Sequence, residues 1–379
     1  MSALRRGRAV GALLLLTVAA AACTPGPARP VIGLAGVADD SVAGLLRDVL
    51  RRQAAGATLG PAIGLAVRRP VAGPPDIETE IRMARDLAAE ASIVAVVGHA
   101  GRRASLASAA VYNARHVPQL VPGGASRLIA HAGAWTFPLA PSDSVEGRAL
   151  VEFAAGRLQA RRLAIAYEND EYGRGVRSGA RAAAARRRLD LLDELPFDAG
   201  SDLGLLAQAM LARGLPDVVL LAASPRQLRR AVDAIAAVNP TPRFVAAVGG
   251  ATHAALGVDS LARPTPELFV AAPWLPDPGD PAQEAFVREF ALRAGRPPEA
   301  RDAFVHDAVQ LLATAVTTVG PDRVRLRDYL GSLGRSRPAF AGLTGPVAFG
   351  DAARPALVVC RVERDRLVPV WRPEADEAG

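Results

Sequence analysis

Few side chains in this sequence combine the residue types and the spacing that chemistry requires. Its five histidines, His99, His116, His131, His253 and His306, lack the spacing of a zinc site, and no G-x-S-x-G nucleophile motif occurs. All 45 basic residues are arginine, which excludes a P-loop lysine, a Schiff-base lysine and a Ser-Lys pair. The sequence therefore favours a protein that is not an enzyme, and it predicts no catalytic residue, no metal and no cofactor.

Cys23 is the residue with the clearest covalent chemistry, because of what precedes it. A basic start, an apolar run at 10–22 and three alanines lead to this cysteine, which is the order of a secretory signal. The apolar run is about 13 residues long, whereas a membrane-spanning helix needs about 20. A retained transmembrane helix is therefore the weaker alternative.

The motif Ala20-Ala21-Ala22-Cys23 resembles the lipobox of bacterial lipoproteins, with Ala20 where a larger aliphatic residue is usual. The resemblance implies that residues 1–22 are a signal peptide and that Cys23 becomes the lipidated first residue of the mature chain. Residues 23–30 are rich in proline and glycine, which suits an extended tether. We expect an extracytoplasmic protein that its lipid anchors to the cell membrane, exported by general secretion or by the twin-arginine route.

The remaining composition argues against two other classes of protein. Beyond Cys23 the only cysteine is Cys360, in an apolar strand-like run, which favours a buried, inert thiol over a nucleophile. The formal charge of +7 reflects an arginine-rich composition, and the densest basic patch, at 181–188, has no interleaved aromatic residues. We expect a monomer that binds no nucleic acid.

Short apolar runs alternate with longer amphipathic stretches from residue 31 onward. The apolar runs predict strands at 31–34, 63–67, 93–97, 119–121, 163–167, 218–221, 244–247 and 269–271. The amphipathic stretches predict helices at 41–53, 77–89, 105–115, 144–158, 173–188 and 225–238. Because this alternation is typical of parallel strands covered by helices on both faces, we expect an α/β protein.

The chain is too long for one core, since single cores stop growing at about 300 residues. Breaks rich in proline or serine interrupt the alternation at 138–143, 273–281 and, less distinctly, 336–345. Three breaks favour two Rossmann-like lobes with parallel sheets, joined by a three-strand hinge. The expected N-terminal lobe is 31–140 plus 272–338, the expected C-terminal lobe is 141–271 plus 339–371, and a tail follows at 372–379.

Five local patterns follow one another along the chain. They are Val94 to Gly98 before a serine-rich helix, His116-Val117-Pro118 leading to Gly123-Gly124-Ala125-Ser126, Tyr167 with Glu171-Tyr172-Gly173, Pro216-Asp217 before a strand, and Asp307-Ala308-Val309 in a helix. Their order and spacing resemble type I periplasmic binding proteins, specifically the leucine/isoleucine/valine-binding branch of solute receptors for ABC importers. The resemblance covers nearly the whole chain beyond residue 31.

This resemblance implies a solute-binding protein that closes its lobes on a small molecule and delivers it to an ABC permease. In open α/β sheets, ligands settle at the carboxyl ends of the strands. A ligand that contacts both lobes favours the closed form by its higher affinity for it. The alternative is a lipoprotein of the same fold that senses a ligand or regulates an envelope enzyme without transport.

The pocket that the resemblance implies departs from the amino-acid-binding pattern on the first lobe. The turn matched to a ligand-binding serine contains Arg102 and Arg103, and the loop of Gly124 and Ser126 has Ala125 where threonine is usual. Either arginine could hold a carboxylate through two hydrogen bonds. The alternative is that both arginines point to solvent.

On the second lobe, the position of the acidic residue that holds a ligand's ammonium falls at Val248 and Gly249, and an aromatic position falls near Ser224. Tyr172 matches the family pattern. Without the hydroxyl and the acid, little offsets the desolvation of a zwitterion. We expect a small polar or anionic solute, such as an amino-acid-like molecule, an amide or a carboxylate.

Trp135 and Trp274 are rare residues in an aromatic-poor chain. Each could stack on a ligand, and each could equally belong to a core.

Overall fold

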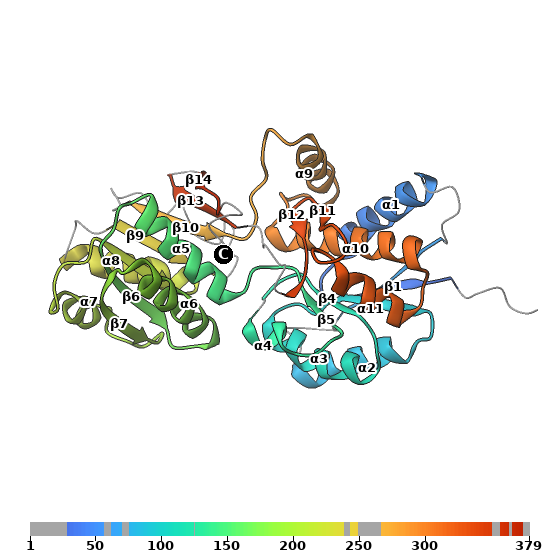
Figure 1. Cartoon of the computed structure of the whole chain (residues 1–379), viewed down its shortest axis with the longest axis horizontal. Coiled ribbons are helices and arrows are strands. Elements are labelled where there is room, and N and C mark those ends of the chain that lie inside the picture. The colour runs from blue at the N-terminus through green and yellow to red at the C-terminus, as the bar shows by residue number, and fades with distance from the viewer. Residues whose placement is uncertain are drawn as a thin grey trace, which may run out of the picture.

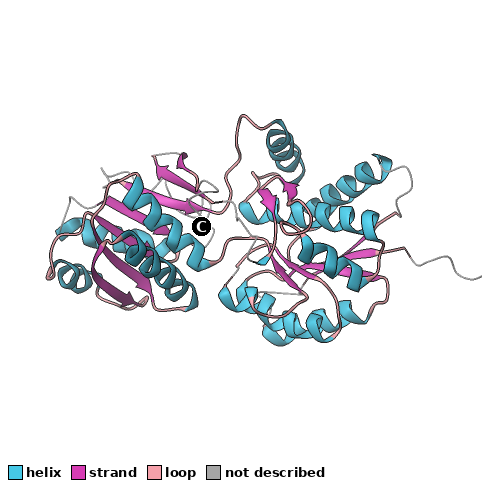
Figure 2. Ribbon diagram, in the orientation of Figure 1, coloured by secondary structure: helices cyan, strands magenta, loops and turns pink. Residues whose placement is uncertain are grey.

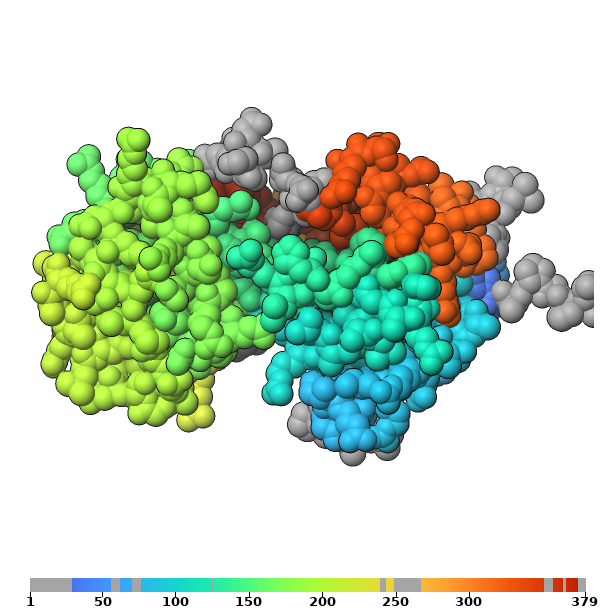
Figure 3. Space-filling model, turned by 60° about the horizontal axis from the view of Figure 1, so that its bottom comes forward, coloured from blue at the N-terminus to red at the C-terminus, as the bar shows by residue number. Residues whose placement is uncertain are grey.

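The computed structural model describes residues 29–56, 62–69, 76–124, 126–238, 243–248, 267–350, 357–363 and 366–373. These residues form two α/β lobes side by side, joined by crossing segments (Figure 1). In each lobe, helices lie on both sides of a central sheet (Figure 2). A space-filling view shows the two lobes as separate masses that meet at the middle of the molecule (Figure 3). The predicted fold class is confirmed.

The first lobe is built on a parallel five-stranded sheet of order β2-β1-β3-β4-β5. Its strands are β1 (Val31–Ala35), β2 (Gly64–Arg68), β3 (Ile93–Gly98), β4 (Gln119–Val121) and β5 (Thr136–Pro138). All six residues of β3 are buried, as expected of a parallel strand that helices cover on both faces. The first four strands confirm the predicted runs, whereas β5 is an addition.

The helices of this lobe come from two separate parts of the chain. They are α1 (Asp40–Gly56), α2 (Ile77–Ala89), α3 (Arg102–Ala114) and α4 (Arg127–Ala130), followed much later by α9 (Pro281–Ala294), α10 (Ala300–Val319) and α11 (Arg323–Ser332). The long helix α10 packs its apolar residues into the same core as β1 and α1. The chain therefore returns to the first lobe after building most of the second.

The second lobe contains a seven-stranded sheet of order β14-β13-β10-β9-β8-β6-β7. Its strands are β6 (Arg162–Glu168), β7 (Asp190–Phe197), β8 (Val218–Ala222), β9 (Arg243–Ala247), β10 (Leu268–Ala272), β13 (Val358–Val362) and β14 (Leu367–Trp371). Within this sheet only β13 is reversed, since it pairs antiparallel with both β10 and β14, whereas the other pairs are parallel. The helices are α5 (Asp143–Gly156), α6 (Glu171–Arg187), α7 (Leu203–Leu211) and α8 (Pro225–Val238).

The third break in the chain lies later than the sequence indicates. A two-stranded hairpin of β11 (Phe340–Gly342) and β12 (Gly345–Val347) follows α11. Val347 and Phe349 are buried in the first-lobe core together with Ile32 and Leu34. The stretch 339–350, expected in the C-terminal lobe, therefore packs with the N-terminal lobe. Burial of these apolar side chains stabilises that arrangement, and the local proline and glycine residues do not indicate it.

No single helix in the described ranges is long and apolar enough to cross a membrane. Helices α10 and α11 meet the length and composition test only as a pair, which is bent by 114°.

Candidate functional site between the lobes

A cavity of about 320 Å³ lies where the two lobes meet, within the range of about 300–1,000 Å³ that is typical of small-molecule pockets. The first lobe contributes Gly101, Arg102, Pro122, Gly123, Gly124, Glu299, Ala300, Arg301 and Phe304, and the rest of the lining comes from Ala140, Pro141, Asp143, Glu146, Tyr172 and Pro273. Most of these positions follow strands β3, β4, β5, β6 and β10 in the chain, and the four from Glu299 to Phe304 lie at the start of α10. The cavity therefore lies where ligands of open α/β sheets bind.

An ion pair crosses the cavity from one lobe to the other. Arg102, the first residue of α3, donates through Nη2 to Oδ1 of Asp143, the first residue of α5, at 2.7 Å. The two side chains are 17% and 6% exposed, so the pair is shielded from solvent screening. The guanidinium also lies over the Tyr172 ring, with Cζ 5.4 Å from the ring centroid, within the range of a cation–π contact.

Asp143 remains difficult to ionise although an arginine pairs with it. Burial raises the pKa of its carboxyl to about 7; Arg102 opposes this rise, and the nearby Glu171 and Asp170 add to it. Nε of Arg102 is buried and has no hydrogen-bond partner among the described residues. The guanidinium therefore retains one unused donor in the cavity wall.

Glu146 is the second acid of the cavity, one helical turn after Asp143. Its side chain accepts a hydrogen bond of 2.7 Å from the Tyr172 hydroxyl, and it is 4% exposed. Burial raises the pKa of Glu146 to about 8, against the lowering effect of the Tyr172 hydrogen bond. No described cation forms an ion pair with it. At neutral pH this carboxyl therefore tends to keep its proton.

Close packing of α5 against α6 places Asp143, Glu146 and Tyr172 together. A Cβ atom on Gly147 would lie 2.0 Å from the Val176 carbonyl oxygen, and one on Gly179 would lie 1.9 Å from the Ser144 carbonyl oxygen. The two helix backbones can approach this closely only because both positions are glycine. The helices stand side by side at the edge of the second lobe that faces the first (Figure 1).

Gly124 lies in the first-lobe wall of the cavity, opposite α5 and α6. Its φ is +66°, and a Cβ atom there would lie 2.9 Å from the Arg102 backbone nitrogen. Both observations favour glycine. The loop after β4 therefore lies directly against the first turn of α3.

Of the residues that the sequence analysis proposed for the site, Arg102, Gly124 and Tyr172 line the cavity. Arg103 is exposed on α3 and does not line it. Arg102 is also less free than expected, because Asp143 already occupies one face of its guanidinium.

The other proposed residues lie elsewhere. Ser126 accepts a hydrogen bond from the Ile129 amide and caps α4, exposed Ser224 precedes α8, and Val248 is buried in a second-lobe core. Ala125 and Gly249 lie outside the described residues, as do Cys23 and nearly all of the tether and tail.

The two acids of the cavity were not predicted from the sequence. Asp143 and Glu146 lie in the first turn of α5; Asp143 is the last residue of a stretch interpreted only as a boundary, and Glu146 follows it. Their spacing of three residues places both on one face of a helix. That spacing, together with the position after a strand end, was the available signal.

Trp135, Trp274 and Cys360 are buried outside the cavity. Trp274 packs against Phe286 in the first-lobe core, with ring centroids 6.2 Å apart, and the Arg327 guanidinium covers Trp135 at 4.9 Å. Cys360 is fully buried in β13, and burial raises the pKa of its thiol to about 11. The prediction of a buried cysteine is confirmed. Among the described residues, no three His, Cys, Asp or Glu side chains cluster as a metal site.

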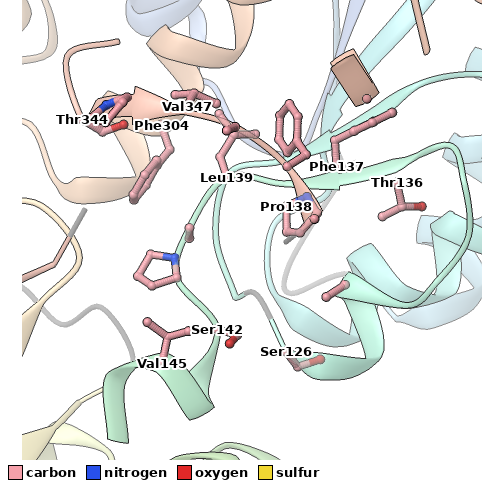
Figure 4. A pocket seen from close by; sticks show the side chains of 18 of the residues that line it. Ser126, Thr136, Phe137, Pro138, Leu139, Ser142, Val145, Phe304, Thr344 and Val347 are labelled. Carbon is pink, nitrogen blue, oxygen red and sulfur yellow. The ribbon is translucent and has the colours of Figure 1, made fainter. Parts of the chain in front are cut away.

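A second cavity, of about 410 Å³, shares Ala140, Pro141 and Phe304 with the first. Figure 4 shows Ser126, Ser142, Val145, Phe304 and Thr344 around it. Its lining is mainly apolar and includes no acidic residue. Asp143 and Glu146 therefore line the first of these two cavities and not the second.

Comparison with known proteins agrees with this architecture. A family model described as periplasmic binding protein matches residues 71–359. No curated protein sequence matches the chain. Similar solved structures include an ABC transporter substrate-binding protein from Desulfitobacterium hafniense, with 23% identity, a TM-score of 0.74 and coverage of 90% of this chain and 99% of that chain.

Two further structures show the same fold with different bound molecules. A branched-chain amino acid transporter substrate-binding protein from Streptococcus pneumoniae, in complex with isoleucine, has 16% identity, a TM-score of 0.70 and coverage of 91% and 99%. An ABC transporter solute-binding protein from R. palustris, in complex with benzoate, has 17% identity, a TM-score of 0.66 and coverage of 91% and 96%.

Proposed function

Because this chain belongs to the periplasmic binding protein family, we propose that it is the extracytoplasmic solute-binding component of an ABC importer. The observation that carries the proposal is the cavity of about 320 Å³, whose walls come from both lobes. A solute that contacts both walls binds the closed form more tightly than the open form and so shifts the population toward closure. A permease can then distinguish the loaded receptor from the empty one.

The solute that we propose is small, polar and amino-acid-like. Relatives of similar fold are described in complex with isoleucine and with benzoate, both small carboxylates. In this chain, Arg102 is already neutralised in part by Asp143. A solute carboxylate at Arg102 must therefore share the guanidinium with Asp143, through the unused Nε donor, or draw on backbone amides at the start of α3.

We further propose that a lipid on Cys23 anchors the receptor to the membrane. The apolar run and the three alanines before Cys23 support this proposal. A short tether keeps the receptor at high effective concentration near a membrane-bound permease. Retention of the full chain in the membrane fraction, lost in Cys23→Ser, is the expected result, and equal retention of both proteins would contradict the anchor.

A thermal-shift screen of the mature chain tests the binding function. Amino acids, amides and small carboxylates are added singly, and ligand at 100 times its Kd adds about 2.7 kcal/mol to the free energy of unfolding. Tyr172→Ala removes the ring beneath Arg102 and should abolish the shift, whereas Tyr329→Ala, on α11 outside the cavity, should leave it intact. If no compound in the screen raises the melting temperature, the binding function fails, and a regulatory lipoprotein of the same fold is favoured.

A further inference from the structure

The three acidic residues of α5 differ in what neutralises them. Asp143 pairs with Arg102, and Glu152 pairs with two arginines of α6. Glu146 lies between them on the same helix and accepts the Tyr172 hydroxyl, but it forms no ion pair with a described cation. It is the acid of α5 that lines the cavity without a counter-ion.

A buried acid without a counter-ion destabilises the folded protein, which suggests that Glu146 has a role other than stability. Transfer of a carboxylate from water to a low-dielectric site carries a desolvation penalty, and a hydroxyl donor offsets only part of that penalty. The alternative is to bury the neutral acid, and burial does raise the pKa of Glu146 to about 8. A cation placed at the Glu146 carboxyl would remove the penalty in either case.

We propose that the captured solute carries a protonated amino group, and that Glu146, with Asp143 beside it, receives this group. The inference rests on the proposed solute-binding function. The two acids lie one turn apart on α5 and both line the cavity. They supply on α5 the negative charge that the family pattern places near Val248, which is buried in a core instead.

The charges around the cavity favour an ammonium over a second anion. Asp143 offsets the charge of Arg102 in part. The first-lobe wall adds one acid and one base, half-buried Glu299 and exposed Arg301, whose charges are opposite. Glu146 is the remaining buried acid of the wall. A solute carboxylate near Glu146 would meet either a like charge or a neutral acid. An ammonium would gain an ion pair shielded from solvent.

Binding then has a defined proton balance. The solute arrives as R–NH3⁺ and keeps its proton, while a protonated Glu146 carboxyl loses its proton to the buffer and forms the ion pair. Up to one proton is released for each solute bound at pH 7, and release decreases as the pH rises above the pKa of Glu146. Affinity for an ammonium solute therefore rises with pH between 6 and 8.

Matched probes separate the two charged groups of an amino acid. L-leucine carries both groups, 3-methylbutylamine carries only the ammonium, and 4-methylpentanoate carries only the carboxylate. Benzylamine and benzoate form a second pair with an aromatic body. Isothermal titration of the mature chain at pH 7, in phosphate and in Tris, gives affinity and proton release together because the two buffers differ in ionisation enthalpy.

We expect the amine-bearing probes to bind with proton release, and the carboxylate-only probes to bind at least about tenfold more weakly. Glu146→Gln keeps the shape and the bond to Tyr172 but cannot be ionised. It should weaken binding of the amine-bearing probes by about 10- to 100-fold and remove most of the proton release, leaving only the share of Asp143. Glu152→Gln, on the same helix but outside the cavity, should change neither.

Each other outcome overturns the inference in a recognisable way. Equal or tighter binding of the carboxylate-only probes removes the ammonium from the site but leaves the solute-binding function intact. Tight binding of L-leucine without proton release, unchanged in Glu146→Gln, shows that the amino group lies elsewhere. If none of the five probes binds, the inference fails, and a negative thermal-shift screen in addition overturns the proposed function itself.

Discussion

Two buried acids in this molecule, Glu80 and Glu146, have similar surroundings but different hydrogen-bond partners. In the first lobe, Glu80 contacts His99, and His99 contacts the Tyr112 hydroxyl at 2.9 Å. In the second lobe, Glu146 contacts the Tyr172 hydroxyl directly, with no histidine between them. Both acids are at most 4% exposed.

The difference lies in where the partners come from. Glu80, His99 and Tyr112 belong to one lobe, and none of them lines the cleft cavity. This sealed network ties α2 and α3 to the end of β3, where the backbone turns toward Arg102. The cleft network of Asp143, Glu146, Arg102 and Tyr172 spans two lobes and faces a cavity. An acid with a permanent nitrogen partner stabilises the fold, whereas an acid without one is available to bind a cationic group of a solute.

The largest expected effect comes from breaking the sealed network. Glu80→Ala leaves the fully buried His99 without its Nδ1 partner, and removing one partner of a buried pair costs about 3–5 kcal/mol of unfolding free energy. Urea-induced unfolding at pH 7 measures this loss. Glu78→Ala provides the control, since Glu78 lies on the same helix with 86% of its side chain exposed and should cost less than about 1 kcal/mol. Similar losses in both variants would show that the network does not stabilise the lobe.

A smaller loss is expected from disturbing the scaffold of the cleft network. In Gly179→Ala the new methyl group meets the Ser144 carbonyl oxygen, 1.9 Å from the ideal Cβ position, so α5 and α6 must separate. Overpacking of this kind costs about 1–3 kcal/mol and should also weaken solute binding, because Glu146 and Tyr172 come from the two helices. Gly156→Ala, at the open end of α5 with nothing within 4 Å, is the matched control. Unchanged stability in Gly179→Ala would contradict the close helix contact.

The two networks also show where sequence patterns suffice and where they do not. Apolar runs such as β3 and β8 are predictable because a buried parallel strand needs nearly continuous Val, Ile, Leu and Ala. Strand β7 was missed because acidic residues interrupt its leucines, as an edge strand permits. The hairpin β11–β12 was assigned to the wrong lobe because its packing partners, such as Ile32, lie far away in the chain.

The site was predicted only in part, for a similar reason. Tyr172 and Arg102 follow local patterns, but their partners Glu146 and Asp143 are 26 and 41 residues away, respectively. Only the α5–α6 contact and the meeting of the lobes bring these pairs together. His99 likewise looked isolated in the sequence, because its partner Glu80 is 19 residues away along the chain. Pairing between elements depends on tertiary packing, which residue spacing does not encode.

The expected effect that is smallest at each step is a pH dependence that belongs to the cleft network, because it accumulates gradually over several pH units. Glu146 has a pKa of 4.5 in its reference state and of about 8 in the folded protein. A carboxyl whose folded pKa is raised stabilises the fold below the unfolded value and loses that contribution as the pH rises through the folded value. The stability of the ligand-free protein should therefore fall between pH 5 and pH 8, by about 1 kcal/mol per pH unit near the middle of this window.

Glu146→Gln removes this titration and should flatten the decline, leaving the part due to Asp143, whose folded pKa is raised to about 7. Melting temperatures of both proteins at pH 5, 6, 7 and 8 measure the difference, with Glu152→Gln as the control because Glu152 is paired with arginines of α6. Parallel curves for the wild type and Glu146→Gln would show that Glu146 is ionised throughout the window. Glu146 would then need no incoming cation to become ionised, and this basis for the contrast between the two networks would disappear.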